Sequence, residues 1–112
     1  MKIRQNAPII LASTSPYRKE VLEKSGVKFK ALPPLDDEEE LKAEISHLDF
    51  AEQALKLAIH KGVKLSLNHP EAYILCADQI GACNNKVYGK SHTKENAIKA
   101  LNELSGQSIT LY

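Results

Sequence analysis

Hydroxyl and cationic side chains crowd a short stretch near the amino terminus, where an aliphatic run gives way to a helical pattern. The stretch reads LASTSPYRKEVLEKSG and includes Ser13, Ser15, Arg18 and Lys19. The unpaired N–H groups and partial positive charge of a helix N-terminus bind anions, and these side chains add donors and charge. The stretch could therefore hold a phosphate chain. An ordinary Ser-Pro helix start with surface cations is the simpler interpretation of the stretch alone, and no P-loop motif supports the phosphate site.

A single acid, Asp78, lies near the carboxyl end of the apolar run AYILCADQI, residues 72–80. An acid in such a place is costly unless it is hydrogen-bonded or used. Ligands of open α/β sheets sit at the carboxyl ends of the strands. Asp78 could therefore hold a metal ion or accept a proton, and a turn or cap acid is an equally good interpretation.

Other polar residues carry weaker signals. Lys90, in YGKSHT, precedes a capped helix and could contact phosphate, although the stretch alone favours a solvated lysine. One acid of the run DDEEE could reach a metal ion, but such runs are usually solvated. The four histidines have no ligand spacing, and the two cysteines are too few for a disulfide framework. A reduced, cytoplasmic protein is the expectation.

The elements that must position these residues alternate between strands and helices. We predict strands at 8–12, 27–32 and 72–80, a hairpin turn at Asn84–Asn85, and a strand in SITLY. We predict helices from the Ser15 cap to Gly26, from Leu48 to Lys61 closed by Gly62, and from the Thr93 cap to Gly106, with loops in PPLDDEEE and SLNHPE. This order indicates an α/β fold with a mixed, twisted sheet and flanking helices.

The bulk composition limits the possible functions. The chain has 112 residues, 43% of them hydrophobic, and a net charge of +1. This length predicts one α/β domain over residues 1–112. A nearly neutral chain offers no electrostatic argument for a nucleic acid polymer, and no apolar run approaches the ~18 residues of a membrane span.

At these same residues the sequence resembles the Maf family of nucleoside triphosphate pyrophosphatases. LASTSPYRKEVLEKSGVKF is similar to the family's opening motif, CADQI to its acidic strand end, and YGKSHTKENAIKALNELSG to its G-K segment. The three motifs occur in order and at matching spacing. The resemblance covers nearly the whole chain but only the N-terminal part of the family's domain, so it implies a Maf-like fold that is truncated here.

The resemblance implies roles residue by residue. Ser13, Arg18 and Lys90 match phosphate-handling positions, and Asp78 matches the catalytic acid, the proton acceptor. Glu38 aligns with the acid of the family's D-E pair, which implies a divalent cation, Mg²⁺ or Mn²⁺, held with Asp78. The implied reaction is hydrolysis of a nucleoside triphosphate to the monophosphate and pyrophosphate.

Two further residues point to one branch of the family. Tyr17 and Gln79 stand where most of the family has Arg and Thr, and both resemble the branch that acts on 7-methyl-GTP. An aromatic face attracts a flat cation such as N7-methylated guanine, and Gln79 could pair with a base edge. A core contact on the helix is an equally good interpretation of Tyr17.

The chain also departs from the family's pattern. Leu57 stands at the place assigned to the family's helical lysine, Ser91 replaces a proline, and a later glutamine has no counterpart. These departures favour an alternative, a catalytically impaired nucleotide-binding fragment. The apolar strand SITLY predicts an open sheet edge and therefore a homodimer.

Overall fold

The computed structural model describes residues 5–35, 38–89 and 91–112. The strands are β1 (Ile9–Ala12), β2 (Lys30–Leu32), β3 (Tyr73–Leu75), β4 (Gly81–Cys83), β5 (Lys86–Tyr88) and β6 (Thr110–Leu111). The helices are α1 (Pro16–Lys24), α2 (Glu39–Glu44), α3 (Phe50–Asn68) and α4 (Lys94–Leu104). The α/β class expected from the sequence is confirmed.

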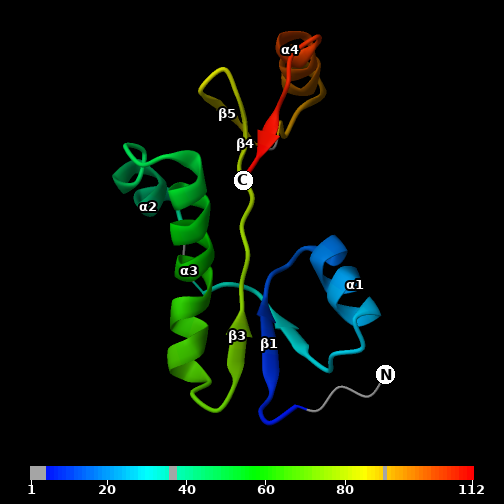
Figure 1. Ribbon diagram of the computed structural model, residues 1–112, viewed down its shortest axis with the longest axis vertical. Helices are drawn as coiled ribbons and strands as arrows, with labels where there is room; N and C mark the ends of the chain where they lie inside the picture. The colour runs from blue at the N-terminus through cyan, green and yellow to red at the C-terminus, as the bar shows by residue number, and fades with distance from the viewer. Residues whose placement is uncertain (1–4, 36–37, 90) are drawn as a thin grey trace.

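The strands form two separate sheets (Figure 1). In the first sheet the order is β2-β1-β3 and all neighbours are parallel. In the second the order is β5-β4-β6 and all neighbours are antiparallel. The parallel and antiparallel pairs of the expected mixed sheet therefore lie in different sheets. We call β1–β3 with α1–α3 the parallel region, and β4–β6 with α4 the antiparallel region.

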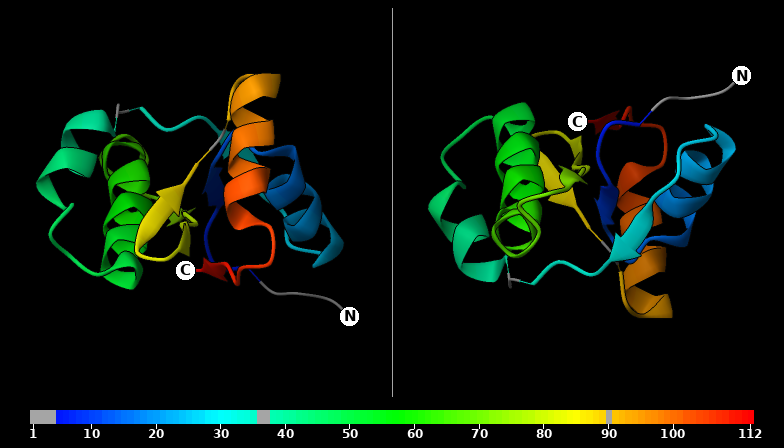
Figure 2. Two further views of the ribbon diagram at one scale, coloured as in Figure 1. Left: turned by 90° about the horizontal axis from the view of Figure 1, so that it is seen from above. Right: turned by 90° about the horizontal axis from the view of Figure 1, so that it is seen from below.

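Helices α1 and α3 lie on opposite sides of the parallel sheet (Figure 2). The strand order explains this placement, because the connection from β1 to β2 runs in one direction across the sheet and that from β2 to β3 runs back past β1. Right-handed crossovers in opposite directions put their helices on opposite faces. The connections thus leave the carboxyl ends of β1 and β3 at one shared edge.

Local sequence signals set the helix ends. Ser15 caps α1, with Pro16 as its first residue, and Thr93 caps α4. Gly26 and Gly106 follow the ends of these helices with φ of 83° and 73°, a conformation that glycine adopts without steric cost. These predicted boundaries are confirmed.

The expected end of the central helix at Gly62 is wrong. Helix α3 begins after the Asp49 cap, whose side chain accepts a hydrogen bond from Glu52 N–H, and it continues through Gly62 to Asn68. Glycine disfavours a helix interior by about 1 kcal/mol relative to alanine. Burial of Leu65, one turn beyond Gly62, favours continuation, and the helix takes in the first half of the expected SLNHPE loop.

The strands are shorter than the sequence patterns predict. Only Tyr73–Leu75 of the expected strand 72–80 pairs with β1, and residues 76–80 form an extended connection between the two sheets. Of the expected strand 27–32, only Lys30–Leu32 pairs. Glu39 and Glu40, predicted to lie in a loop, begin α2 instead. Asp36 and Asp37 lie outside the described residues. The continuous apolar run over 72–80 thus marks a segment that alternates between half-buried and exposed residues up to the buried Ile80, and only its first part pairs.

The main side-chain core joins α2, α3 and the extended connection. Its buried members are Ile45, Ala54, Leu57 and Ile80. The Ile80 backbone exchanges two hydrogen bonds with Tyr112, whose ring lies 5.6 Å from that of Phe50 between centroids. The start of α3 therefore contacts both the connection and the end of β6.

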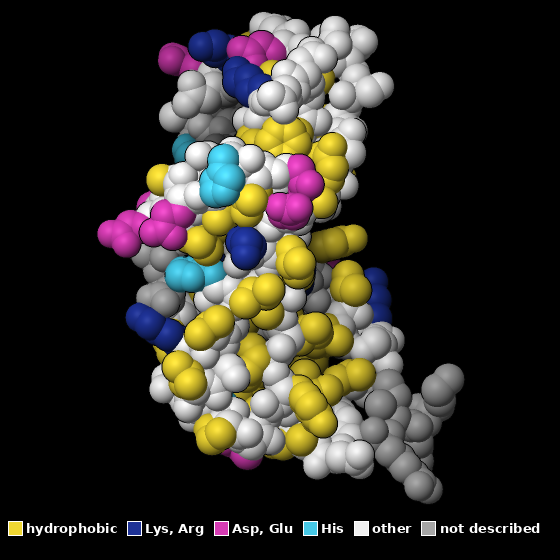
Figure 3. All heavy atoms as spheres, turned by 60° about the vertical axis from the view of Figure 1, so that its left-hand side comes forward, with side chains coloured by type: hydrophobic (Ala, Val, Ile, Leu, Met, Phe, Trp, Pro, Cys, Tyr) yellow, Lys and Arg dark blue, Asp and Glu magenta, His cyan; other side chains and the backbone are white. Residues whose placement is uncertain are grey.

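The outward side of α3 carries exposed hydrophobic side chains, which Figure 3 shows gathered over the helix. Its exposed aliphatic residues are spaced four apart and are Leu55, Ile59, Val63 and Leu67. Of the helices in the described ranges, none is both long and apolar enough to span a bilayer.

Candidate functional site

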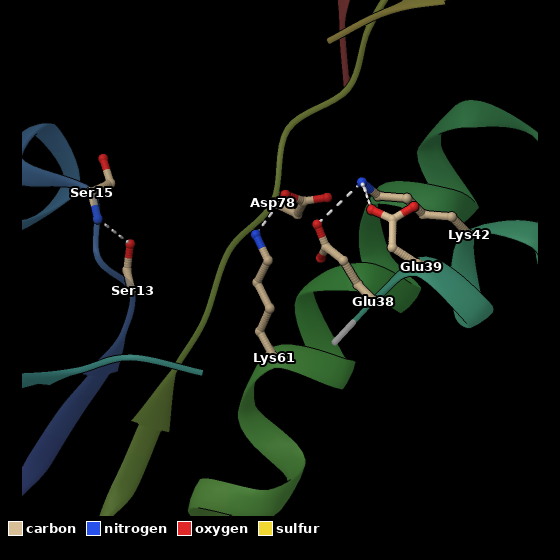
Figure 4. A network of polar contacts seen from close by, with 7 residues as sticks. All are labelled: Ser13, Ser15, Glu38, Glu39, Lys42, Lys61 and Asp78. Atoms are coloured by element: carbon tan, nitrogen blue, oxygen red, sulfur yellow. Dashed lines mark hydrogen bonds and ion pairs between the residues drawn. The ribbon is translucent and has the colours of Figure 1, made fainter. Parts of the chain in front are cut away.

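The candidate site lies at the edge where β1 and β3 end. Ser13 follows β1 directly, and Asp78 lies three residues beyond β3. Because β1 and β3 are parallel neighbours, both residues lie toward the same edge of the sheet (Figure 4). This is the edge at which open α/β sheets bind ligands.

Backbone contacts order the loop from β1 to α1. Ser13 N–H donates to Leu32 O at 3.0 Å, and Ser15 N–H donates to Ser13 Oγ at 3.0 Å. The Arg18 N–H in turn donates to Ser15 Oγ at 3.3 Å. A hydroxyl that accepts a hydrogen bond can still donate its own hydrogen. Ser13 is therefore fixed in place and can still donate to a ligand.

Asp78 forms an ion pair with Lys61 of α3. Lys61 Nζ donates to Asp78 Oδ1 at 2.8 Å, and the two side chains are only 17% and 14% exposed. The pair joins residues 17 positions apart across the helix and the extended connection. The other carboxylate oxygen, Oδ2, takes no part in this bond. Asp78 is thus oriented by a cation and keeps one oxygen for other chemistry.

Lys61 is a candidate site residue that sequence reasoning missed. Leu57, assigned to the place of the family's lysine, is a core residue with 4% exposure. Lys61 lies four residues later, one helical turn along the same side of α3. The sequence did contain a signal for Lys61, because it lies one turn beyond Ala54 and Leu57 on the helix face predicted to be buried. A cation on a buried helix face needs a partner. Leu57 packs in the core, and Lys61 is the lysine of α3 that contacts Asp78.

Glu38 adds a second carboxylate. Its Oε1 lies 3.4 Å from Lys42 Nζ, which also contacts Glu39 at 3.5 Å. Its Oε2 is buried and has no hydrogen-bond partner. Figure 4 shows the side chains of Glu38 and Asp78 pointing into the same space between α3 and the extended connection. A buried carboxylate oxygen without a partner is costly, so this arrangement suits a bound cation.

The chemistry of this donor set fits Mg²⁺ or Mn²⁺. Magnesium is commonly held by one or two carboxylates together with substrate phosphates and water, and Glu38 and Asp78 would supply two carboxylates. Among the described residues, which exclude Asp36 and Asp37, no three His, Cys, Asp or Glu side chains cluster as a metal site.

Nearby titratable groups respond to this environment. Partial burial lowers the pKa of Lys42, but Glu38 and Glu39 outweigh burial, so the pKa lies above its ordinary value. Burial raises the pKa of the Cys76 thiol, and the charge of Lys61 offsets this only in part. Lys42 therefore stays charged beside Glu38, and Cys76 stays a neutral thiol near neutral pH.

The remaining predicted site residues differ in their exposure to solvent. Tyr17 is 74% exposed and Arg18 is half-buried, both in the first turn of α1. Gln79 is exposed and follows Asp78 directly. Lys90 lies outside the described residues. The structure thus brings Lys61 into contact with Asp78, turns Glu38 toward them, and puts Ser13 at the same edge.

Comparison with known proteins matches these residues to one family. The family model described as Maf-like protein matches residues 8–112. A 7-methyl-GTP pyrophosphatase of Colwellia psychrerythraea is 42% identical over 106 residues, which cover 93% of this chain and 50% of that protein. A 7-methyl-GTP pyrophosphatase of Vibrio vulnificus is 37% identical, with 96% of this chain and 53% of that protein covered.

A third relative carries a broader name. A nucleoside triphosphate pyrophosphatase of Legionella pneumophila subsp. pneumophila is 35% identical over 106 residues, which cover 95% of this chain and 53% of that protein. The chain spans about half the length of the curated relatives it matches. Since the family match takes in nearly all of the sequence and includes Ser13, Lys61 and Asp78, the chain belongs to the Maf family.

Proposed function

We propose that this chain carries the reacting edge of a nucleoside triphosphate pyrophosphatase, which hydrolyses its substrate to a nucleoside monophosphate and pyrophosphate. The observation that supports it best is the Lys61–Asp78 ion pair beside the unpartnered Glu38 oxygen. A carboxylate, a lysine and a cation site at one sheet edge suit a reaction that depends on positioning and charge.

Asp78 would accept the proton of the attacking water. Its Oδ1 is held by Lys61 at 2.8 Å, so the carboxylate is oriented before substrate binds and Oδ2 can accept a hydrogen bond from water. Attack on the α-phosphorus then breaks its bond to the bridging oxygen. Pyrophosphate leaves with that oxygen and the electron pair of the broken bond.

Donors around the site would bind the phosphate chain. The ordered Ser13 hydroxyl can donate to a phosphate oxygen, and Arg18 lies in the first turn of α1. We assign the same role to Lys90 from its motif. Charge on the pyrophosphate oxygens grows as the bond breaks, so these cations stabilise the transition state more than the bound substrate.

Glu38 and Asp78 would hold the divalent cation. The partnerless Glu38 Oε2 is the observation that favours this assignment. When bound, the cation supplies positive charge to the phosphate oxygens. Lys42 keeps Glu38 in position through its other oxygen.

Within the nucleoside triphosphates, we assign 7-methyl-GTP as the substrate. Two of the relatives bear that name, and Tyr17 presents an exposed ring in the turn that also carries Arg18. Attraction between an aromatic face and the methylated, cationic base contributes roughly 0.5–2 kcal/mol. Gln79, next to Asp78, would contact a base edge. Tyr17→Arg with Gln79→Thr should shift preference from 7-methyl-GTP toward UTP and dTTP, and a wild type that prefers UTP contradicts the assignment.

Nucleotide binding without turnover is the second candidate. Its support is the ordered Ser13 hydroxyl just before α1, which can bind a phosphate without a proton acceptor. Titration with 7-methyl-GTP tests binding, and pyrophosphate release tests turnover. We expect Asp78→Asn to abolish release while keeping affinity within about tenfold, or 1.4 kcal/mol. Glu44→Gln, an exposed change on α2, is the matched control. Binding without release in wild type supports the second candidate, and release that survives Asp78→Asn rejects Asp78 as the proton acceptor.

We also propose that the chain self-associates through the edge strand β6. Among the described residues, strand β6 pairs with β4 on one side only in the order β5-β4-β6, and both Leu111 within it and Ile109 just before it are exposed. Open apolar edges invite pairing with another chain. Sedimentation velocity at micromolar concentration should give a dimer, and a stable monomer contradicts this proposal.

A further inference from the structure

Gly62 lies where α3 comes closest to the strand and connection beneath it. It is buried in the middle of the helix. A Cβ at this position would meet Cys76 Sγ at 2.9 Å and Ile74 Cγ2 at 3.2 Å. The first distance is shorter than real Cβ contacts, so any side chain at position 62 requires the Cys76 sulfur to shift. This requirement explains why the poorest helix former after proline stands inside a long helix.

The contact between Gly62 and Cys76 adjoins the proposed reacting groups. Lys61 precedes Gly62, and Asp78 lies two residues beyond Cys76. Residues of an extended chain alternate between its two sides. Burial follows this alternation, with Ile74, Cys76 and Asp78 half-buried and Leu75 and Ala77 exposed. The side that packs against Gly62 is therefore the side that presents Asp78 to Lys61.

Cys76 acts here by its size and not by its reactivity. Its thiol is half-buried under α3, and burial raises its pKa. A raised pKa leaves little thiolate, the form that reacts. The sulfur instead fills the space that Gly62 leaves open, so the two residues are matched in volume across the helix–strand contact.

We propose that Gly62 and Cys76 are a size-matched pair of positioning residues that sets the distance between Lys61 and Asp78. The role in nucleotide binding rests on the proposed function, whereas the effect on the ion pair does not. A displacement of about 1 Å in a reacting constellation can cost about 100-fold in rate. The size of the side chains at positions 62 and 76 therefore affects the site, although neither residue touches the substrate.

The test is a double-mutant cycle made of Gly62→Ala, Cys76→Ala and the double variant. Gly62→Ala adds the clashing methyl group, and Cys76→Ala removes the sulfur that it would strike. In the double variant the nearest atom of residue 76 is the Cβ at 3.6 Å, an ordinary contact, and Ile74 Cγ2 at 3.2 Å needs to give by only a few tenths of an ångström. Cys76→Ala alone is the matched control, because it changes the same contact without adding an atom.

Two measurements separate the ion pair from the function. The NMR signal of the Lys61 ammonium group reports its hydrogen bond to Asp78, and titration with Mg²⁺ and 7-methyl-GTP reports binding. We expect Gly62→Ala to lose the ammonium signal and weaken binding by about tenfold. Cys76→Ala should keep both, and the double variant should recover the signal and bind within about threefold of wild type.

Lack of recovery in the folded double variant overturns the proposal, as does an unchanged ammonium signal in Gly62→Ala. If Gly62→Ala does not fold, the double variant decides: a folded double variant with the signal supports size matching, and an unfolded one rejects it. The chain could also bind no nucleotide while its Lys61 ammonium signal is lost in Gly62→Ala and recovered in the double variant. That outcome supports the positioning pair and rejects the proposed function.

Discussion

The parallel and antiparallel regions are stabilised in different ways. Buried side chains of the parallel region include Ile10, Leu11, Leu57 and Leu65, contributed by a strand and a helix. In the antiparallel region, the described buried residues are Ala82 and Cys83 of β4, and α4 has no buried residue. Packing therefore holds the first region far more than the second.

Polar contacts at the surface hold the antiparallel region instead. Glu103 of α4 accepts hydrogen bonds from Lys86 Nζ at 2.9 Å and Tyr88 Oη at 2.8 Å, both on β5. Lys86 Nζ also lies 5.1 Å from the centroid of the Tyr88 ring. Exposed ion pairs contribute little to stability. We therefore expect this region to open locally at a lower free energy than the region that carries Lys61.

The largest contrast should come from truncating one leucine in each region. Leu57→Ala removes a side chain that is 4% exposed in the main core, and it should lower the free energy of unfolding by about 3 kcal/mol. Leu101→Ala, on α4 with 67% exposure, should change it by less than about 0.5 kcal/mol. Urea denaturation of both variants measures the difference. Equal losses would mean that α4 is packed as tightly as α3.

The ion pair at the site should show the next largest effect. Lys61→Met keeps the length of the side chain but leaves Asp78 without its partner, and we expect a loss of about 2 kcal/mol, less than for a fully buried pair. Binding of 7-methyl-GTP should weaken by at least about tenfold. Lys56→Met, an exposed change on the same helix, is the control and should stay near wild type in urea denaturation and nucleotide titration. A Lys61→Met variant as stable as the control would show that Asp78 is solvated without the lysine.

Helix ends and turns that depend on contacts between residues close in sequence could be predicted from the sequence. The Ser15 and Thr93 caps, and the glycines that follow α1 and α4, depend on contacts within a few residues. The turn at Asn84–Asn85 is of the same kind, since both residues take a positive φ, of 50° and 64°, that asparagine tolerates. These features were predicted correctly because their physical causes are local.

Features that depend on distant contacts were missed. Helix α3 continues through Gly62 because Leu65, one turn further on, is buried, and the glycine lies against Cys76 of another element. Lys61 of α3 contacts Asp78, which lies beyond β3, and β3 is held in place by its pairing with β1. The sequence singled out Asp78 as an acid in need of a partner, but the choice of that partner is made by the tertiary fold.

The smallest effect we predict concerns pH and the antiparallel region. Hydrogen bonds from Lys86 and Tyr88 lower the pKa of Glu103 below its ordinary value of 4.5. A carboxyl with a lowered pKa in the folded state stabilises the fold above its ordinary pKa, and this contribution is lost as pH falls through the lowered value. Glu103→Gln keeps the shape of the side chain and an oxygen that can accept from Tyr88, but it removes the charge.

We therefore expect amide hydrogens of β5 and α4 to exchange faster in Glu103→Gln than in wild type at pH 7. Apparent local stability, corrected for intrinsic exchange, should converge between the two proteins as pH falls below 4.5, while amides of β1 and α3 should not distinguish them at any pH. Glu95→Gln, on the first turn of the same helix, controls for removal of a charge from α4. A difference that persists at low pH would mean that the Glu103 side chain acts through packing and not through its charge.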